Sequence, residues 1–191
     1  MPRIIAIQFT TVDGIVEDPD GSAGTATGGW AFRHGPEAVA GDKFRLGPLL
    51  ETGVLLLGRR TWELFSGLWP NRTDPFSQAM NAATKVVATT SRTDFGAWAN
   101  SSPLEDELCE AAASIRDERD VIVAGSTSVV HALAARDLVD EYRLLVFPTL
   151  LGAGRRLFAD GGGPSAFSTA SVDAAGPAVL VRYERERAAE G

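Results

Sequence analysis

The chain has 191 residues, of which 45% are hydrophobic, and a formal net charge of -7. This length allows one domain with a sizeable core, and the excess of negative charge argues against a nucleic-acid partner. The single cysteine, Cys109, excludes an intrachain disulfide and a cysteine-based zinc site. No apolar run reaches the roughly 18 residues of a membrane helix, and Met1 does not open a signal-peptide pattern, which favours the cytoplasm.

Short runs rich in Val, Ile and Leu recur along the chain and are expected to form strands. Such near-continuous apolar runs suit strands that are buried on both faces of a parallel sheet. The runs are Ile4 to Phe9, Gly53 to Leu57, Lys85 to Thr89, Val121 to Ala124 and Tyr142 to Phe147. After a turn-rich break at Gly161 to Pro164, a last run from Ala178 to Glu184 is expected to be antiparallel.

Helical patterns alternate with these runs. They are expected over Pro36 to Leu50, Pro75 to Ala83, from Ser102 onward, and over Ser126 to Arg136. Ser102 with Glu105 three residues later forms the pattern of a capping box at the start of the third helix. The alternation predicts an α/β fold with a twisted, mostly parallel central sheet, helices on both faces and an antiparallel C-terminal strand.

A glycine-rich segment over residues 18–29 interrupts the pattern near the N-terminus. It has little apolar content and is long for a loop, so a functional lid or binding loop is expected. Trp30 follows it and is predicted either to contact a flat heterocycle or to pin the loop to the core. No linker divides the sequence, so residues 1–191 are expected to form one domain.

The turn after the second expected strand is the first candidate for a binding site. It reads Gly58, Arg59, Arg60, Thr61. A strand that ends at glycine and opens a helix presents free backbone N–H groups, and these attract phosphate. Arginine adds charge with forked donors, and threonine adds a hydroxyl. The alternative is an ordinary helix start with surface arginines.

Two further turns have similar chemistry. Ser91 and Arg92 follow the third expected strand, where hydroxyls and an arginine suit the 2′-phosphate of NADP. Gly125, Ser126 and Thr127 follow the fourth, where glycine allows a close approach to the backbone. Each turn alone also fits simple capping or a polar loop. A dinucleotide across the carboxyl ends of neighbouring strands explains all three turns together.

Four sequence blocks resemble the RibD C-terminal family, which has the dihydrofolate-reductase-like fold. They occur in family order and extend from the first expected strand to Phe158. The blocks are Ile4 to Gly14 with its Thr-Val-Asp-Gly element, Leu55 to Glu63, Val123 to Leu144, and Phe147 to Phe158 with its Pro-x-x-x-Gly-x-Gly pattern. One departure is Ala124 before Gly125, where dihydrofolate reductases carry two glycines.

The resemblance implies an NADPH-dependent reductase that transfers hydride to a small heterocyclic or sugar-like substrate. It is closest to 5-amino-6-(5-phosphoribosylamino)uracil reductase of riboflavin biosynthesis. The three turns would hold NADPH, and Asp13 and Gly14 would border the nicotinamide and the substrate. Trp30 is the further candidate for a substrate contact. A homodimer is also implied by the resemblance.

The proton donor is left open by the sequence. Asp13 and Asp42 are the catalytic candidates, and Asp42 stands sixteen residues before Gly58, where an ungapped comparison with dihydrofolate reductases puts their acidic residue. Glu37, His34 or an ordered water are the other candidates. Metal catalysis is not expected, because the two histidines and one cysteine lack ligand spacing. The alternatives to the reductase are a true dihydrofolate reductase and a nucleotide-binding module without turnover.

Overall fold

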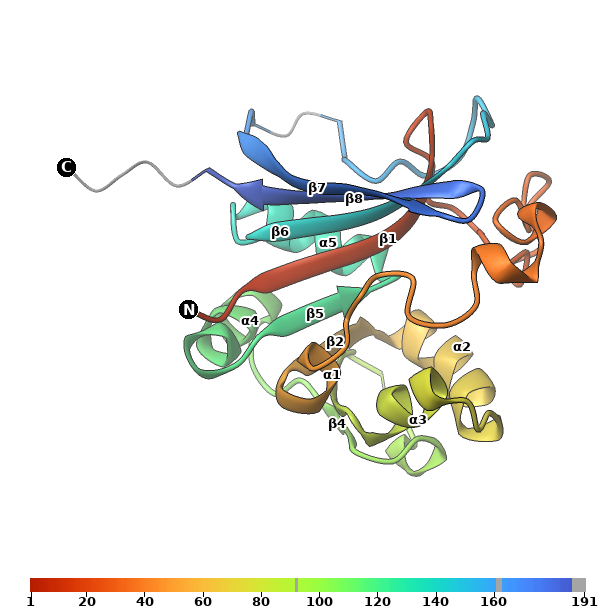
Figure 1. Ribbon diagram of the computed structural model, residues 1–191. Coiled ribbons are helices and arrows are strands. Elements are labelled where there is room, and N and C mark those ends of the chain that lie inside the picture. Colours follow the sequence, from red (N-terminus) through yellow and green to blue (C-terminus); the bar gives the residue numbers. More distant parts are fainter. Residues whose placement is uncertain (92, 161–162, 187–191) are drawn as a thin grey trace.

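The protein is built around a twisted central sheet (Figure 1). The computed structural model describes residues 1–91, 93–160 and 163–186. Within these ranges the sheet has eight strands in the order β4-β3-β2-β5-β1-β6-β8-β7. The strands are β1 (Ile4–Thr11), β2 (Val54–Gly58), β3 (Thr84–Ala88), β4 (Ser101–Pro103), β5 (Val121–Ala124), β6 (Glu141–Phe147), β7 (Phe167–Ala175) and β8 (Ala178–Arg185). The first six strands in this order, from β4 through β1 to β6, are parallel to one another, whereas β8 is antiparallel to both β6 and β7. This confirms the predicted fold class.

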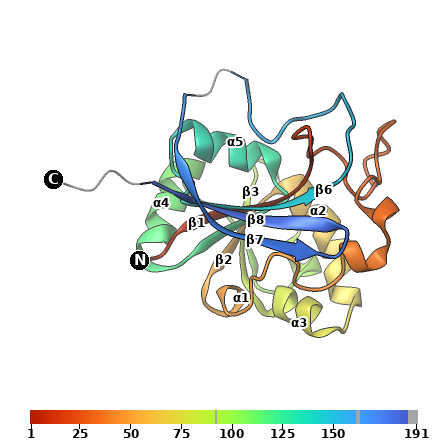
Figure 2. The same cartoon turned by 45° about the horizontal axis from the view of Figure 1, so that its top comes forward.

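Helices cover both faces of the sheet (Figures 1 and 2). They are α1 (Leu49–Thr52), α2 (Arg59–Leu68), α3 (Pro75–Ala82), α4 (Leu108–Glu118) and α5 (Thr127–Ala135), with short 3-10 turns η1 (Phe32–His34), η2 (Pro36–Ala38), η3 (Trp69–Asn71) and η4 (Phe95–Ala97). Alternate residues of β1 enter different cores: Ile4 and Ala6 pack with α4 and α5, and Ile5 and Ile7 pack with α1 to α3. This double burial explains why the strand sequences are almost continuously apolar.

The helix predicted over Pro36 to Leu50 is wrong. Only α1 at its end is α-helical, and the rest consists of η2 and turns. Gly41 and Gly47 both adopt positive φ, at 73° and 40°, a conformation incompatible with a right-handed helix. The segment 39–47, called the strap below, crosses the face of the sheet as an irregular chain.

The capping box predicted at Ser102 and Glu105 is also wrong. Ser102 and Pro103 belong to β4, an edge strand where proline is tolerated. Helix α4 starts later, and the Glu107 carboxylate caps it by accepting hydrogen bonds from the N–H groups of Cys109 and Glu110. The helix is capped by a side chain, as predicted, but the cap lies five residues later in the chain, because Ser102 and Pro103 pair with β3.

The C-terminal part holds one strand more than predicted. Strand β7 precedes β8 and pairs with it through a hairpin that turns at Gly176, whose φ is 66°. Its small and polar residues lack an apolar signature, and Val172 is 62% exposed. Pairing with β8 therefore decides the conformation of this segment. Among the described helices, none is long and apolar enough to cross a bilayer.

Candidate functional site

The three predicted turns lie on one edge of the sheet. Strands β3, β2 and β5 are direct neighbours in the sheet order and run parallel, so their carboxyl ends meet on the same side. Each predicted turn begins where one of these strands ends. We call this edge, with the turns at Gly58 to Thr61, Ser91 and Gly125 to Thr127, the cofactor edge.

Two helices open at the cofactor edge with free N-termini. Neither α2 nor α5 has a side-chain hydrogen bond at its N-cap or an acidic residue in its first turn. By contrast, α3 is capped by Asp74 and α4 by Glu107. Unsatisfied N–H groups and the positive helix end attract an anion, so α2 and α5 together provide donors for phosphate.

Side chains fasten the two helix starts to each other. The hydroxyl of Ser126 accepts a hydrogen bond from the N–H of Gly58 at 2.9 Å and donates to the carbonyl of Ala124 at 3.2 Å. Gly125 has a φ of 63°, and a side chain there would meet the Thr61 methyl group at 3.5 Å. Ser126 is only 3% exposed, so it shapes the turn from below while glycine keeps the space above it open.

A cavity of about 500 Å³ lies at the end of β3 and brings Arg59 and Ser91 together. Thr89 and Thr90 also line it, and Asp106 and Glu107 lie on its other side. Arg59 forms an ion pair with Glu63 at 2.7 Å, one helical turn further on. The predicted role of Arg92 falls outside the described residues. The lining thus combines hydroxyls and one guanidinium with two carboxylates.

The Asp13 carboxylate holds two loops together. It accepts hydrogen bonds from the Thr11 hydroxyl at 2.5 Å and from the N–H groups of Leu151 and Gly152 at 3.2 and 2.7 Å. The hydrogen bond from Thr11, followed by that from Gly152, holds the pKa of Asp13 below its ordinary value. Asp13 is therefore ionised at neutral pH, which disfavours it as a proton donor, and its catalytic role stays a prediction.

We expect Asp13→Asn to lower the melting temperature near neutral pH by roughly 2–4 °C, because the amide keeps one acceptor but turns an N–H group toward backbone donors. A carboxylate with a lowered pKa stabilises the fold above its unfolded-state pKa and loses this effect as pH falls. The difference between wild type and variant should therefore shrink on acidification below the ordinary pKa of 3.8. Thermal melts across this range measure it, and a constant difference would contradict the anchoring role.

The structure places Asp42 in a turn of the strap. Both carboxylate oxygens accept backbone hydrogen bonds, from the N–H groups of Leu46 and Gly47, each at 2.8 Å. Asp42 thus stabilises the irregular chain that replaces the predicted helix. It remains at a cavity wall, but its oxygens already have partners, so a role as proton donor stays a prediction.

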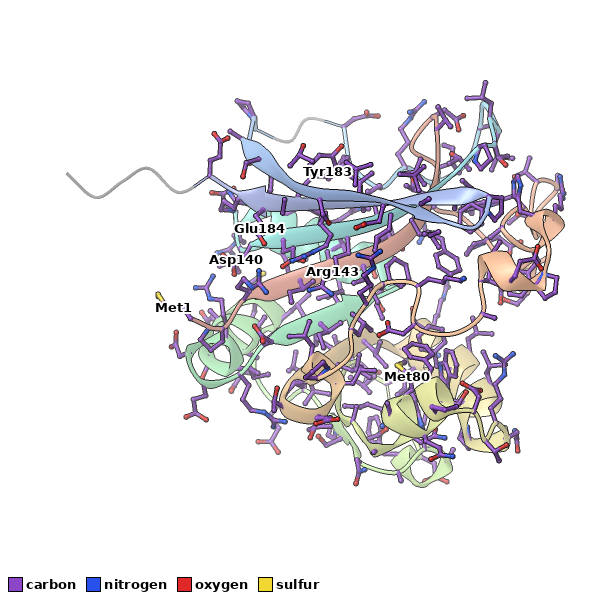
Figure 3. All side chains as sticks on the ribbon, viewed as in Figure 1. Met1, Met80, Asp140, Arg143, Tyr183 and Glu184 are labelled. Atoms are coloured by element: carbon purple, nitrogen blue, oxygen red, sulfur yellow. The ribbon has the colours of Figure 1, made fainter. Side chains whose placement is uncertain are left out.

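Arg143 fastens the strap to the sheet. Its Nη1 donates to the carbonyl oxygens of Phe44 and Arg45 at 2.9 and 2.6 Å, and the Phe44 ring stacks on Phe9 of β1 at 5.3 Å. In Figure 3 Arg143 lies on β6 beside the strap. A second link joins Arg45 to Asp173 of β7 at 3.0 Å. These tertiary contacts hold the strap where it bounds a cavity.

This second cavity, called the strap cavity, has a volume of about 770 Å³. It lies between the strap, α1 and the η3–α3 segment. Its lining consists of Val39, Ala40, Gly41, Asp42, Gly47, Leu50, Glu51, Trp69, Arg72, Asp74, Pro75, Phe76 and Ala79. Sequence reasoning missed Arg143, because its partners Phe44 and Arg45 lie about a hundred residues away in the chain.

The glycine-rich loop is a compact turn around Asp18. The Asp18 carboxylate accepts hydrogen bonds from the N–H groups of Ala23 and Thr25 at 2.9 Å each. Trp30 is fully buried, and its indole N–H donates to the carbonyl of Glu17. The structure therefore contradicts a direct substrate contact for Trp30 and supports the alternative that it pins the loop. Gly14, with a φ of 78°, stays half-exposed beside Asp13.

His34 has a defined partner at the end of β6. Its Nε2 lies 2.8 Å from the Thr149 hydroxyl, and its ring lies against Phe147. It is half-buried, and its role as a candidate proton donor stays a prediction. No group of three or more potential metal ligands occurs among the described residues.

Sheet order, helix layers and the open helix starts define an α/β protein of the dihydrofolate-reductase-like class. The sequence pattern of the family described as RibD C-terminal domain matches residues 2–181. The chain therefore belongs to the RibD C-terminal domain family. A relative, protein YyaP of Bacillus subtilis (strain 168), is 25% identical over 165 residues, covering 83% of this chain and 81% of its own; its name describes it as uncharacterized.

Solved structures share the fold at low identity. A putative riboflavin biosynthesis protein from Shewanella sp. PV-4 has a TM-score of 0.73 at 18% identity, covering 97% of this chain and 99% of its own. RibD of Acinetobacter baumannii has a TM-score of 0.64 at 19% identity, covering 98% of this chain but 59% of its own. A deaminase/5-amino-6-(5-phosphoribosylamino)uracil reductase from Thermotoga maritima has a TM-score of 0.58 at 15% identity, with 96% and 56% covered. The chain thus spans little more than half the length of the last two.

Proposed function

We propose that this protein is an NADPH-dependent reductase that transfers hydride to a small heterocyclic substrate. The observation that carries the proposal is the pair of uncapped, acid-free helix starts at α2 and α5, joined through Ser126. Two such N-termini side by side suit the two phosphates of a dinucleotide. Arg60 is exposed at the same turn and adds a positive charge.

The edge also has the right extent for an elongated cofactor. From β3 to β1 there are three strand intervals of about 4.8 Å, or roughly 14 Å in all. The adenosine would lie in the cavity with Arg59 and Ser91, and the nicotinamide would lie near β1. Strand β5 ends at Ala124, and the N–H of Gly125 donates to the Ile7 carbonyl. The backbone N–H and C=O groups of successive strand residues point to opposite sides, so those of Phe9 point to the same side as those of Ile7. Strand β5 has already ended at this level, so the Phe9 groups face the proposed nicotinamide position.

NADPH would supply the hydride. The residues of this chain would bind and orient it, and the strap cavity would hold the substrate against it. Asp13 is ionised and fixed by three donors, so we assign it the positioning of the loop at Leu151 and Gly152. We assign proton delivery to water. The phosphorylated aminouracil in the name of the Thermotoga protein is one candidate substrate. A homodimer stays a prediction.

The cofactor site is tested by titrating the protein with NADPH and NADH in a calorimeter. We expect the double variant Arg59→Ala, Thr61→Ala to weaken NADPH binding about tenfold or more, because a charge-assisted contact and a hydroxyl at the phosphate turn are lost. Its melting temperature should change little, since the ion pair of Arg59 with Glu63 is exposed and the Thr61 hydroxyl makes a long, exposed hydrogen bond to the Gly125 carbonyl at 3.4 Å. Arg136→Ala, at the other end of α5, is the control and should bind as wild type does.

Two outcomes would overturn parts of this proposal. Absence of binding of either nucleotide at millimolar concentration would refute a nicotinamide cofactor. Equal affinity for NADPH and NADH would refute the 2′-phosphate role assigned to Ser91 and Arg92.

A further inference from the structure

The lining of the strap cavity is negatively charged, which is unfavourable for a phosphorylated substrate. Three of its lining residues carry carboxylates, namely Asp42, Glu51 and Asp74, and Arg72 alone carries a positive charge. The hydrogen bond from the Ser77 hydroxyl lowers the pKa of Asp74, which keeps this carboxylate ionised. The charged lining therefore sums to a net negative charge at neutral pH.

One wall of the cavity is aromatic. Trp69 and Phe76 meet edge to face at 5.6 Å, and Phe65 meets Trp69 in the same way at 5.8 Å. Phe65 extends this row to the cofactor edge, because its Cζ lies 3.9 Å from the position of a Cβ on Gly125. This row of rings thus connects the wall of the strap cavity with the turn at Gly125 on the cofactor edge.

A cation already lies on the aromatic wall. The guanidinium carbon of Arg72 is 5.4 Å from the centre of the Trp69 ring. Within the described part of the chain, Arg72 has no carboxylate within ion-pair distance, so the ring itself attracts it. The indole ring of Trp69, which lines the same cavity as Asp74 and Glu51, therefore attracts positive charge.

From these observations we infer that the strap cavity binds a flat aromatic compound that carries a positively charged amino group and no phosphate. This deepens the proposed function by naming the substrate class. An aromatic ring would pack on Trp69 and Phe76, and its ammonium group would meet the carboxylates of Glu51 and Asp42. A phosphate would instead bring two negative charges beside three carboxylates, against a single arginine.

The test uses two probes with the same ring and opposite charge. 1-Naphthylmethylamine and 1-naphthyl phosphate are titrated into the full chain without nucleotide and followed by calorimetry. We expect the amine to bind about tenfold or more tighter than the phosphate, and its affinity to fall with added salt. Glu51→Lys makes the charged lining neutral, with two carboxylates against two cations, so it should abolish the preference for the amine. Glu118→Lys makes the same charge change on an exposed part of α4 and should leave the preference for the amine unchanged.

Tighter binding of the phosphate, or no binding of either probe, would overturn the inference. So would an equal response of the Glu51→Lys and Glu118→Lys variants, because the effect would then reflect total charge rather than the cavity. The proposed function fails separately, through the nucleotide titrations. A protein that binds the amine but neither nucleotide would keep the cavity assignment and lose the reductase.

Discussion

Glu141→Ala should lower the free energy of unfolding by about 3–5 kcal/mol, because it would leave buried arginine charge without a partner. Glu141 is fully buried on β6, and its carboxylate lies 2.6 Å from Arg3, 2.6 Å from Arg143 and 3.0 Å from Arg182. Burial by itself would raise the pKa of Glu141, but hydrogen bonds from Arg182 and Arg143 lower it overall. The group is therefore ionised at neutral pH.

Urea unfolding with wild type as reference measures this loss. Glu184→Ala is the matched control, because Glu184 belongs to the same ion-pair network but its side chain is 43% exposed, so a loss of at most about 1 kcal/mol is expected. A lowered carboxyl pKa stabilises the fold above the unfolded-state value, and this effect disappears as pH falls. The Glu141 deficit should shrink on acidification. Equal losses in both variants would contradict the burial argument.

Lys85→Met should cost about 2–4 kcal/mol of folding free energy, because it leaves buried carbonyl groups without a donor. The Lys85 side chain is fully buried and donates to the carbonyls of Met80, Asn81 and Ala83 at 2.7–3.0 Å, closing the end of α3. Its ammonium also lies 4.4 Å from the centre of the Trp98 ring. Met80 marks this helix in Figure 3.

Lys43→Met is the matched control at the other lysine of the chain, and we expect a change within about 0.5 kcal/mol there. Burial lowers the pKa of Lys85 from 10.5 to about 8. Between these values the unfolded chain holds the proton more tightly, so stability rises with pH across this window. The gap between wild type and Lys85→Met should thus widen from about pH 7 to about pH 10 in urea titrations. A gap that narrows would contradict the direction of the shift.

Local sequence predicts these strands well because each is short and largely apolar, and β1, β2, β5 and β6 are almost completely buried. Every expected strand from Ile4 to Phe9 through Ala178 to Glu184 lies within about one residue or two of an observed one. The predicted starts of the helices agree less uniformly with the structure. Helix α5 begins within one residue of its predicted start, whereas the helix expected at Ser102 begins only at Leu108. Competition between capping and strand pairing is not visible in a local pattern.

In the candidate site, too, some features follow from the local sequence and others from the tertiary structure. The sequence indicates each phosphate-compatible turn, since glycine, hydroxyl and arginine at a strand end are local features. The sheet order then makes three of these turns neighbours. The sequence also singled out Asp13, Asp42 and Trp30, but it did not predict the backbone donors that the two carboxylates bind or the full burial of Trp30. Those partners lie up to 139 residues away, as for Asp13 and Gly152.

The sequence by itself determined the α/β class, the family and the chemistry of the cofactor edge, because these depend on periodicity and on residues next to one another. Only the tertiary structure decided the course of the strap. Its glycines allow many conformations, and the arginine that fixes it, Arg143, lies about a hundred residues away on β6. The negative, aromatic strap cavity follows from that placement, since its walls come from segments that meet only in the folded chain.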